Sequence, residues 1–526
     1  MNFKGIRRFL TSLMCISLIS PFPLIAAELK MGTATEPSSI DPHFSTVSAN
    51  QQISSHIFDT LIRKNANLQL EPGLATSWRQ LDKLTWEIKL RPNVTFHDGS
   101  EFNADDVIFT IKRIPNIKDS PSTFERNIKG IASTQVVDPM TIRFKMKKES
   151  PMFPLDLSFI YIISNRLPAS VSSSDFHRKG AAIGTGPFKF IEWVPGDRVV
   201  LERNQNYWGE KTTWEKVTIK PIPNDPSRVT ALLAGDVDII DKVPPTDLER
   251  LLRDSKIDLW RTPSSRMMYV HMDTARDQTP FVTAKDGGKL EKNPLKDLRV
   301  RRALSKAINR EAIASRLFHG AAEPTGQFVA KGMVGWVADM LPEKYDPNGA
   351  KKLLAEAGYP DGFAMTLHCT NNRYVNDVQV AQVVAQFLSR IGIKMNVQGM
   401  PKNVFFPRAT KREFSFFQLG FGNSTGDAAR GLTAVMATYD KSAGMGANNR
   451  GRYSNPEFDR LIKLAAVTSD VRKRESYLQE ATRLAIGEDQ AIIPLYFTTL
   501  NWATRGGLKY EARMDENTLA QSVSRK

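Results

Sequence analysis

The sequence predicts a mixed α/β protein with room for about three domains. Runs that alternate apolar and polar residues, typical of half-buried strands, are interleaved with runs that repeat apolar residues at helical spacing. The chain has 526 residues, enough for about three domains of ~150 residues. Its 41% hydrophobic and 24% charged residues are ordinary for a soluble globular protein.

The first 27 residues have the pattern of a secretory signal peptide. Three basic residues precede a short apolar run at 9–19, and the small residues Ala26 and Ala27 follow it. The run is too short to span a bilayer permanently. We therefore expect cleavage near Ala27 and export of a soluble chain to the periplasm.

The formal net charge of +16 is unusually high, and the chain without residues 1–27, which carry three basic and no acidic residues, would keep +13. The basic residues are scattered along the chain rather than gathered in one block. We interpret the surplus as a solvated basic surface, and we expect no nucleic-acid partner after export.

Individual elements can be placed by their periodicity and by the residues that end them. Predicted strands have alternating apolar side chains: Thr85–Leu90, Thr141–Met146, Arg198–Glu202 and Val217–Pro221. Predicted helices repeat apolar residues at helical spacing: Arg299–Leu317, Asn348–Ala357, Val378–Arg390, Pro456–Val467 and Val471–Gly487. The polar, glycine-bearing stretches 275–296 and 438–452 predict long surface loops.

The stretch FHDGSEFNADDVIFTIKR gathers one histidine and three aspartates. Asp98 and Gly99 follow a predicted strand and favour a tight turn. Asn103 then precedes a helical run whose first turn contains Asp105 and Asp106, and an Asn cap with first-turn carboxylates favours a helix N-terminus. The stretch therefore predicts a turn and a capped helix rather than a metal or catalytic cluster.

Enzyme signatures are missing from the sequence. It contains no H-E-x-x-H, Walker, G-x-S-x-G or C-x-x-C motif. Gly184-Thr185-Gly186 lacks the third glycine of a phosphate loop and leads into a strand-like run. Cys369, which would be the one cysteine left after export, lies in another strand-like run, so we expect a buried side chain rather than a nucleophile.

Seven motifs together resemble those of the extracellular solute-binding proteins of family 5, the dipeptide/oligopeptide type that serves ABC importers. Each motif is weak alone, but they occur in family order over nearly the whole exported chain. They are 71-EPGLATSW-78, 96-FHDG-99 with 103-NADDV-107, 183-IGTGPFKF-190, 202-ERNQNYWG-209, 299-RVRRALSKAINREAI-313, 353-LLAEAGYPDGF-363 and 493-IPLY-496.

The resemblance implies a two-lobed periplasmic binding protein of the large type II form, with an extra inserted domain. The ligand would lie between the lobes, which would close over it by a hinge motion. The implied division is a signal peptide at 1–27, first-lobe segments at 28–60, 181–268 and 491–526, the inserted domain at 61–180 and the second lobe at 269–490.

The resemblance also implies ligand-binding residues. Dipeptide-binding relatives hold the ligand carboxylate with a second-lobe arginine, and NNRYVND occupies that region here, so Arg373 is implied as the anchor. Its planar fork can donate two parallel hydrogen bonds to a carboxylate. Phe421 keeps an aromatic of the relatives' amine site, Ser424 replaces the amine-binding aspartate, and Asp427 matches a second acid. Thr46 is a further candidate contact.

Other solutes and another class of protein stay open. Ser424 cannot supply the charge that a ligand ammonium group prefers, so the ligand is a longer or modified peptide, or no peptide at all. The seven histidines form no compact motif, but relatives include binders of haem and of metal chelates, and an oligosaccharide is a further alternative. A secreted hydrolase using Asp98, Asp105 and Asp106 is the alternative from another class.

We therefore predict a periplasmic solute receptor without catalysis of its own. It would bind a peptide or peptide-like solute between its lobes and deliver it to an ABC permease in the inner membrane. We expect a monomer that uses no metal and no cofactor.

Overall fold

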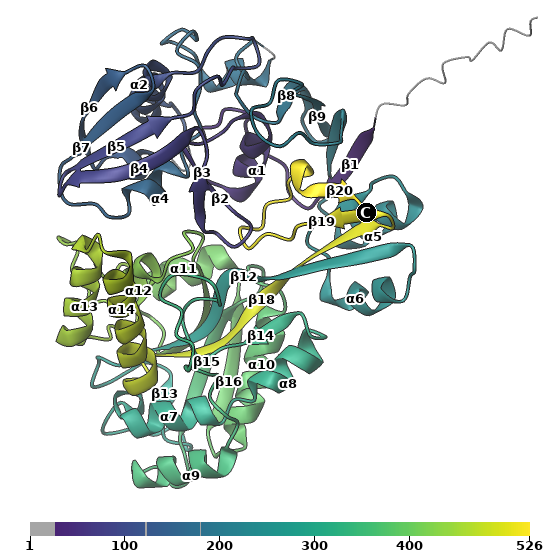
Figure 1. The fold of residues 1–526 in the computed structure, drawn as a ribbon. Coiled ribbons are helices and arrows are strands. Elements are labelled where there is room, and N and C mark those ends of the chain that lie inside the picture. The colour runs from purple at the N-terminus through teal and green to yellow at the C-terminus, as the bar shows by residue number, and fades with distance from the viewer. Residues whose placement is uncertain (1–26, 121–123, 179) are drawn as a thin grey trace, which may run out of the picture.

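The computed structural model describes three stretches of the chain, 27–120, 124–178 and 180–526. The predicted export signal lies outside these residues apart from Ala27. The described chain forms an upper and a lower body, and two long strands run between them (Figure 1): β12 (Ile257–Met272) and β18 (Ile492–Arg505).

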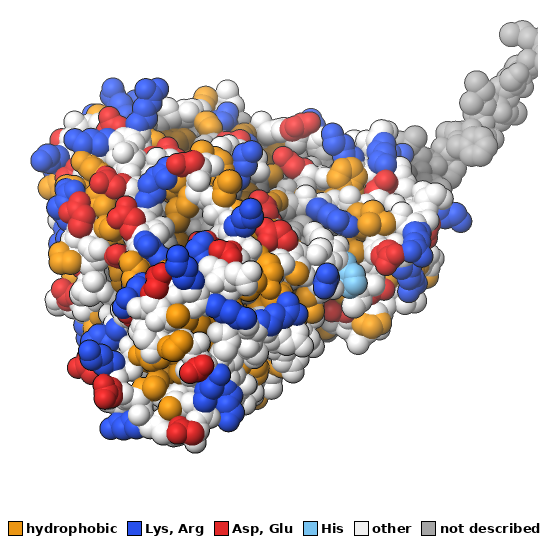
Figure 2. All heavy atoms as spheres, turned by 90° about the horizontal axis from the view of Figure 1, so that it is seen from below, with side chains coloured by type: hydrophobic (Ala, Val, Ile, Leu, Met, Phe, Trp, Pro, Cys, Tyr) orange, Lys and Arg blue, Asp and Glu red, His pale blue; other side chains and the backbone are white. Residues whose placement is uncertain are grey.

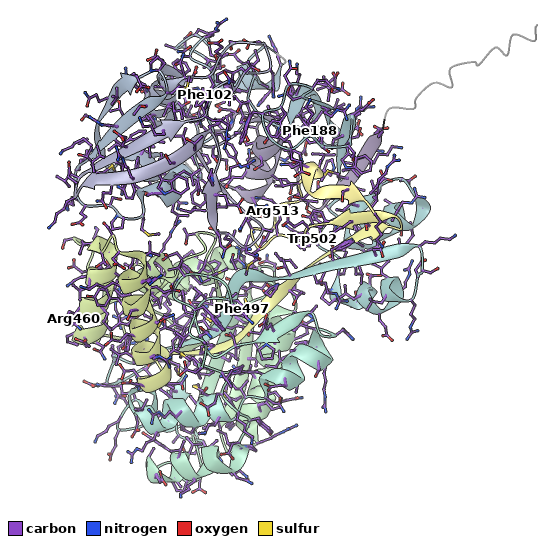
Figure 3. The ribbon with its side chains drawn as sticks, in the orientation of Figure 1. Phe102, Phe188, Arg460, Phe497, Trp502 and Arg513 are labelled. Carbon is purple, nitrogen blue, oxygen red and sulfur yellow. The ribbon has the colours of Figure 1, made fainter. Side chains whose placement is uncertain are left out.

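These crossing strands pair antiparallel along most of their length and contribute side chains to both bodies. Trp502 packs in the core of the upper body, whereas Phe497 packs in the core of the lower one (Figure 3). The pairing register breaks between Pro263 and Met267, where three residues of β12 lie opposite Thr498 alone. A bulge of this kind bends a strand and increases its twist. The crossing strand β12 therefore changes direction here, where it passes from one body to the other.

The first lobe is the part of the upper body built around β1. This strand lies parallel to both of its neighbours, β10 and β11, and its side chains Leu29 and Met31 are fully buried. Helix α1 (Ser48–Ile57) packs on the same core. The strand order here is β8 (Phe188–Val194), β9 (Arg198–Arg203), β10 (Lys216–Pro221), β1 (Glu28–Thr33) and β11 (Ile239–Ile240), and the last of these pairs with β18.

The lobe is completed by segments far apart in sequence. The short strands β19 (Leu508–Tyr510) and β20 (Val523–Arg525) pair with each other near the C-terminus. Helices α5 (Asp225–Ala234) and α6 (Pro245–Leu252) lie beside the crossing strands (Figure 1).

The inserted region is the rest of the upper body and has its own sheet and core. Its short helices are α2 (Ala104–Arg113), α3 (Glu125–Ile128) and α4 (Phe153–Leu157). A two-stranded hairpin formed by β2 (Ile62–Lys64) and β3 (Leu70–Pro72) projects toward the lower body. In the described residues the sheet order is β4 (Ala75–Asp82), β5 (Thr85–Leu90), β7 (Thr141–Met146) and β6 (Ile131–Asp138).

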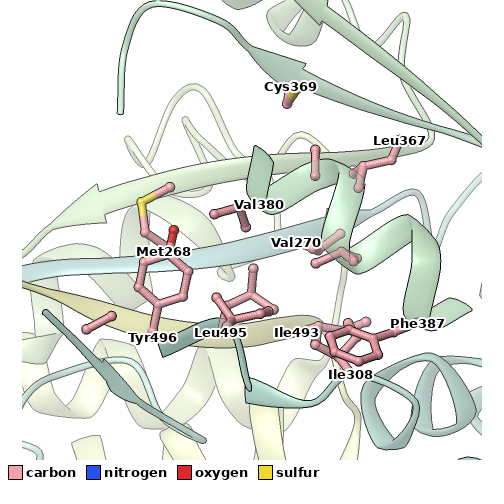
Figure 4. Close-up of a cluster of buried hydrophobic side chains, with 14 of the residues drawn as sticks. Met268, Val270, Ile308, Leu367, Cys369, Val380, Phe387, Ile493, Leu495 and Tyr496 are labelled. Atoms are coloured by element: carbon pink, nitrogen blue, oxygen red, sulfur yellow. The ribbon is translucent and has the colours of Figure 1, made fainter. Parts of the chain in front are cut away.

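The second lobe is the lower body, and helices cover its mixed sheet. Its core includes Cys369, Val380 and Tyr496 (Figure 4), and burial raises the pKa of the Cys369 thiol to about 12. Cys369 is therefore a buried core side chain, as predicted. The remaining strands are β13 (Val282–Thr283), β14 (Ala322–Pro324), β15 (Ala364–Thr370), β16 (Lys394–Met400) and β17 (Phe416–Gly422). The main helices are α7 (Leu298–Lys306), α9 (Pro347–Glu356), α10 (Asp377–Ser389), α11 (Lys402–Thr410), α12 (Ala428–Val435), α13 (Pro456–Val467) and α14 (Val471–Thr482).

Most predicted elements are confirmed to within two residues, but the single helix expected over 299–317 is wrong. Helix α7 ends at Lys306, and Asn309 begins a new turn by accepting a hydrogen bond from the backbone N–H of Ala312. A π-helical turn, Ile313–Leu317, follows. Asparagine side chains compete in this way for backbone groups, which explains the interruption. The predicted helix 471–487 likewise ends in a π-helical turn, Arg483–Glu488.

The aspartate-rich stretch folds as the sequence predicts. Gly99 has φ of +86°, and the carboxylate of Asp98 accepts from the backbone of Ser100 in the turn. Asn103 and Asp106 then form a reciprocal capping box at the start of α2. All three aspartates of the stretch therefore belong to the turn or to the helix start.

No helix in the described stretches is long and apolar enough to cross a membrane.

On the face seen from below, basic and acidic side chains are interspersed rather than gathered in one basic block (Figure 2). This distribution agrees with the predicted solvated surface.

Candidate functional site

A cavity of about 820 Å³ lies where the first lobe, the hairpin β2–β3 and the second lobe meet. The upper body contributes α1, the residues after β9 and the C-terminal segment. The lower side is formed by Ser265 and Arg266 of the β12 bulge and by Gly422 and Ser424 at the end of β17. Because the bulge is part of the wall, a rotation of the second lobe about the crossing strands changes the shape of this cavity. We call it the hinge cavity.

The lining of the hinge cavity is polar and nearly balanced in charge. Aromatic rings add flat apolar surfaces from Phe159, Tyr161 and Tyr207. A solute with groups of both charges can find partners here, which a purely apolar pocket would not offer. The basic side chains are Arg63, Lys64, Lys211, Arg266, Lys509 and Arg513, and the acidic ones are Asp59, Glu71, Glu210, Glu511, Asp515 and Glu516.

Arg513 and Asp515 form a nearly buried ion pair at 2.7 Å in this lining. Burial alone would lower the pKa of Arg513, but Asp515, together with smaller contributions from Tyr510 and Glu511, outweighs burial and raises it. The same guanidinium donates to the backbone oxygens of Lys64 and Asn65, at 3.1 and 3.3 Å. Arg513 therefore joins the C-terminal segment to the base of the hairpin, as Figure 3 shows by its place between the upper body and the crossing strands.

Lys64 extends from the hairpin across the cavity. Its Nζ lies 3.7 Å from the centre of the Phe159 ring and donates to the backbone oxygen of Ser424 at 3.3 Å. Burial lowers the pKa of Lys64 to about 8, with a smaller contribution from Arg513. This lysine is therefore a polar contact between the inserted region and the second lobe.

Asp59 lies at the base of the hinge cavity and joins three segments of the upper body. Its Oδ2 accepts from the Trp208 indole at 2.8 Å and from the Thr185 hydroxyl at 3.0 Å. Burial raises the pKa of Asp59. The neighbouring Gly184 is required, because a Cβ there would lie 2.0 Å from the Ile57 backbone oxygen. The backbone of the Gly-Thr-Gly stretch therefore passes so close to the backbone at Ile57 that no side chain fits between them.

The candidate residues Thr46 and Ser424 both line the hinge cavity. Phe421 lies in a second, smaller cavity of about 120 Å³, which Ser424 also lines and which we call the mouth cavity. The Phe421 ring packs against Phe328 with centroids 5.7 Å apart. These three candidates therefore line two neighbouring cavities that share Ser424.

Asp427 and Arg373 are placed differently. Both carboxylate oxygens of Asp427 accept from buried Arg474, at 2.6 and 3.0 Å, and one also caps α12 at Ala429. Arg373 is exposed, lies with its guanidinium over the Tyr374 ring at 5.2 Å, and lines neither of the two cavities. A ligand role for either residue stays a prediction.

Several residues of the two cavities were not predicted from the sequence. They are Lys64 and Arg513 in the hinge cavity, and Arg126 and Arg430 in the mouth cavity. None lies in a pattern that singles it out, because each is one arginine or lysine among 72 in the chain. Only the fold brings them together.

Two histidines of the upper body, buried His56 and half-buried His97, hold backbone groups in place. His56 donates from Nδ1 to the Gln52 oxygen at 2.7 Å, and its Nε2 accepts from the Ala520 N–H at 3.0 Å. His97 accepts from the Gly184 N–H. Burial lowers the pKa of both imidazoles to about 4, so both are neutral near pH 7.

Comparison with known proteins agrees with this architecture. Residues 69–443 match the bacterial extracellular solute-binding proteins, family 5 Middle. The chain is 28% identical over 505 residues to the glutathione-binding protein GsiB of Salmonella typhi, covering 93% of this chain and 92% of the relative. It is 29% identical to the oligopeptide-binding protein AppA of Bacillus subtilis, over 94% of this chain and 91% of AppA.

The solved structure of HbpA2 from Haemophilus parasuis has the same fold, with a TM-score of 0.83 at 23% identity over 95% of this chain and all of HbpA2. The expected two-lobed fold is thereby confirmed. Since the family match spans most of the sequence, the chain belongs to the family 5 bacterial extracellular solute-binding proteins.

Proposed function

We propose that this protein is a periplasmic receptor that binds a peptide or peptide-like solute between its lobes and delivers it to an ABC permease in the inner membrane. The observation that carries the proposal is the hinge cavity, which both lobes line with balanced charges and aromatic rings. A peptide has charged ends, polar backbone groups and apolar side chains, so this lining offers partners to each part of it.

The relatives support the same class of solute. One is described as a glutathione-binding protein and another as an oligopeptide-binding protein, and both align with more than nine-tenths of this chain. Identities of 28% and 29% leave the pocket chemistry free to differ, so the class of solute is better supported than any single solute.

Within the site, we propose Thr46, Phe421 and Ser424 as ligand contacts. All three line the cavities that the two lobes share. Asp427 would act on the ligand through the loop and helix that it orders, because Arg474 already occupies its carboxylate. Arg373 would reach a solute only if closure brings its loop toward the cleft.

We propose that the protein binds without catalysis and acts as a monomer after cleavage of its export signal. The acids of the hydrolase alternative support this, because Asp98 orders a turn and Asp106 caps α2. Neither lines the hinge or the mouth cavity.

Native mass spectrometry of freshly purified protein, followed by calorimetry with glutathione and a tripeptide panel, tests the function. We expect a peptide-like solute to bind, to be returned unchanged and to raise the melting temperature. At a hundredfold excess over Kd, binding stabilises the folded state by about 2.7 kcal/mol. Turnover of the solute, or binding of haem or a metal chelate but of no peptide, would contradict the proposal.

A further inference from the structure

The mouth cavity brings together two arginines from opposite sides of the cleft. Arg126 lies on α3 of the inserted region, whose neighbours Phe124 and Ile128 pack in the core of that region. Arg430 lies in the first turn of α12, whose buried side chains belong to the second lobe. The two residues are 304 positions apart in sequence, yet both line one cavity of about 120 Å³.

Neither guanidinium group has a hydrogen-bond or ion-pair partner among the residues that the structure describes. Within the described stretches, neither donates a hydrogen bond or forms an ion pair within 4.0 Å. Other arginines near the cleft are paired, such as Arg474 with Asp427 and Arg513 with Asp515. Both arginines are exposed in this structure, so water can solvate them while the cleft is open. Closure of the cleft would remove that water, and an unpaired guanidinium is costly to desolvate, so closure favours an anion between the two.

Asp156 is a nearby carboxylate, but among the described residues it forms no ion pair within 4.0 Å with either arginine. Asp156 lies close enough to feel both positive charges, but its Oδ1 accepts from the Asn127 amide at 2.9 Å instead. Burial raises the pKa of Asp156 to about 6. Desolvation, followed by the positive charge of Arg126, lowers the pKa of Arg430. Asp156 acts in the opposite direction with a smaller contribution, so it offsets the repulsion between the two arginines only in part.

The rest of the mouth cavity suits the end of a peptide-like molecule. Phe421 supplies an apolar ring beside the two charges, and the exposed Ser424 lies between the mouth and hinge cavities because it lines both. A solute that occupies the hinge cavity can therefore extend past Ser424 toward the arginines. Among the described residues, the mouth lining has two basic side chains and no acidic one, in contrast to the balanced hinge cavity.

We propose that Arg126 and Arg430 form a subsite for a carboxylate of the solute. The carboxylate would bridge the inserted region and the second lobe. Without it, the positive charges of the two arginines repel each other and oppose closure of the cleft. With it bound, both arginines can donate hydrogen bonds to it only when the cleft is closed. This inference rests on the proposed peptide-like solute, and it identifies the solute as one that carries an acidic group at the mouth end of the cleft.

Calorimetry with matched acidic and neutral probes tests the subsite. The probes are glutathione, glutathione diethyl ester, trialanine and trialanine amide. The proteins are the wild type, Arg430→Gln, Arg126→Gln and the double variant, with Arg460→Gln as a control. Arg460 is an exposed arginine on the outer side of the second lobe, paired with Glu457 (Figure 3). Arg373→Gln is measured beside them as the competing anchor.

We expect the wild type to bind at least one free-acid probe about 10- to 100-fold more tightly than its neutral partner, as loss of charge-assisted hydrogen bonds predicts. Arg430→Gln and Arg126→Gln should each reduce this ratio, and the double variant should bring it near one while keeping affinity for the neutral probe. Arg460→Gln should leave the ratio unchanged.

Three results would overturn the subsite. The first is equal affinity of the wild type for acid and neutral probes, and the second is an undiminished ratio in the double variant. The third is loss of the ratio in Arg373→Gln instead, which would make Arg373 the anchor. In these three cases peptide binding itself, and so the proposed function, still stands. If the wild type binds no probe at all, the proposed function fails and the subsite fails with it.

Discussion

The two ends of the cleft differ in whether protein contacts already join the upper and lower bodies there. At the hinge end, two strands cross between the bodies, and the hairpin β2–β3 contacts the second lobe through Lys64 and Leu68. At the mouth end, Arg126 and Arg430 face each other without any ion pair between described residues. The contrast suggests that the hinge end is fixed before ligand arrives, whereas the mouth end is left for the ligand to complete.

The hairpin tip shows how closely the hinge end is fitted. Leu68 is only 3% exposed and packs with core residues of the second lobe, although it belongs to the inserted region. Its backbone oxygen lies 2.7 Å from where a Cβ of Gly426 would be. The contact therefore depends on a glycine in the second-lobe loop, and it is a second point, besides the crossing strands, at which the two bodies meet.

The largest effect is expected from breaking the ion pair that orders the second-lobe wall. Asp427→Ala leaves Arg474 buried and unpaired and removes the cap of α12, which should lower the free energy of unfolding by about 3–5 kcal/mol. Urea denaturation measures this loss. The matched control is Glu457→Ala, which breaks the exposed pair with Arg460 and should cost less than about 1 kcal/mol. If Asp427→Ala were as stable as the wild type, the ion pair with Arg474 would contribute nothing to folding, and the carboxylate of Asp427 could serve the ligand instead.

Low pH should lower the free energy of unfolding through His56, which lies in the core of the first lobe beside the hinge cavity. The folded pKa of His56 is about 4, below its value of about 6.5 in an unfolded chain. The unfolded state therefore binds the extra proton, and the stabilisation present above pH 6.5 is lost as the pH falls toward 4. Between pH 7.5 and 5 this one residue should cost about 2 kcal/mol.

The measurement is the free energy of unfolding at both pH values in two variants. His56→Gln should flatten the pH dependence by that amount even if the variant is less stable at both values. His319→Gln, which changes an exposed histidine, should keep the wild-type pH dependence. An equal slope in His56→Gln and the wild type would show that His56 titrates normally in the folded protein.

A smaller effect is expected at the contact between the hairpin and the second lobe. Gly426→Ala places a Cβ against the backbone of Leu68 at a φ of +68°. Gly444 has the same backbone conformation with nothing within 4 Å of a Cβ, so Gly444→Ala carries only the conformational cost of about 1 kcal/mol. Gly426→Ala should cost more and should expose the hairpin to proteolysis. Equal stability of the two variants would mean that the hairpin contact contributes nothing.

The sequence predicts local structure better than it predicts the site, for a physical reason. The start of α2 and both ends of α13 follow from caps and periodicity within about a dozen residues. The helix expected over 299–317 is wrong because Asn309 competes for backbone groups, an effect that apolar spacing does not contain.

Pairings across the fold are beyond such patterns. Arg474 and Asp427 are 47 residues apart, so local sequence cannot show that the carboxylate is already used inside the second lobe. Arg126 and Arg430 are farther apart still and meet only because the two bodies face each other. Resemblance to a family indicated the region of the second-lobe wall, where Phe421 and Ser424 lie, but not the two arginines.

The central claim, that the cleft closes at its mouth around a fixed hinge end, is tested most directly by distances between spin labels. One pair, Lys129→Cys with Lys463→Cys, spans the mouth between exposed positions of the inserted region and the second lobe. The other pair, Leu252→Cys with Glu323→Cys, places exposed labels on α6 and β14 beside the crossing strands. The buried thiol of Cys369 should stay unlabelled.

We predict that a saturating peptide-like ligand shortens the mouth distance and leaves the hinge distance nearly constant. In the Arg126→Gln, Arg430→Gln double variant, the mouth distance should shorten less at the same saturation. If both distances stay unchanged in the wild type at proven saturation, or if both change equally, the contrast between a fixed hinge end and a ligand-completed mouth is contradicted.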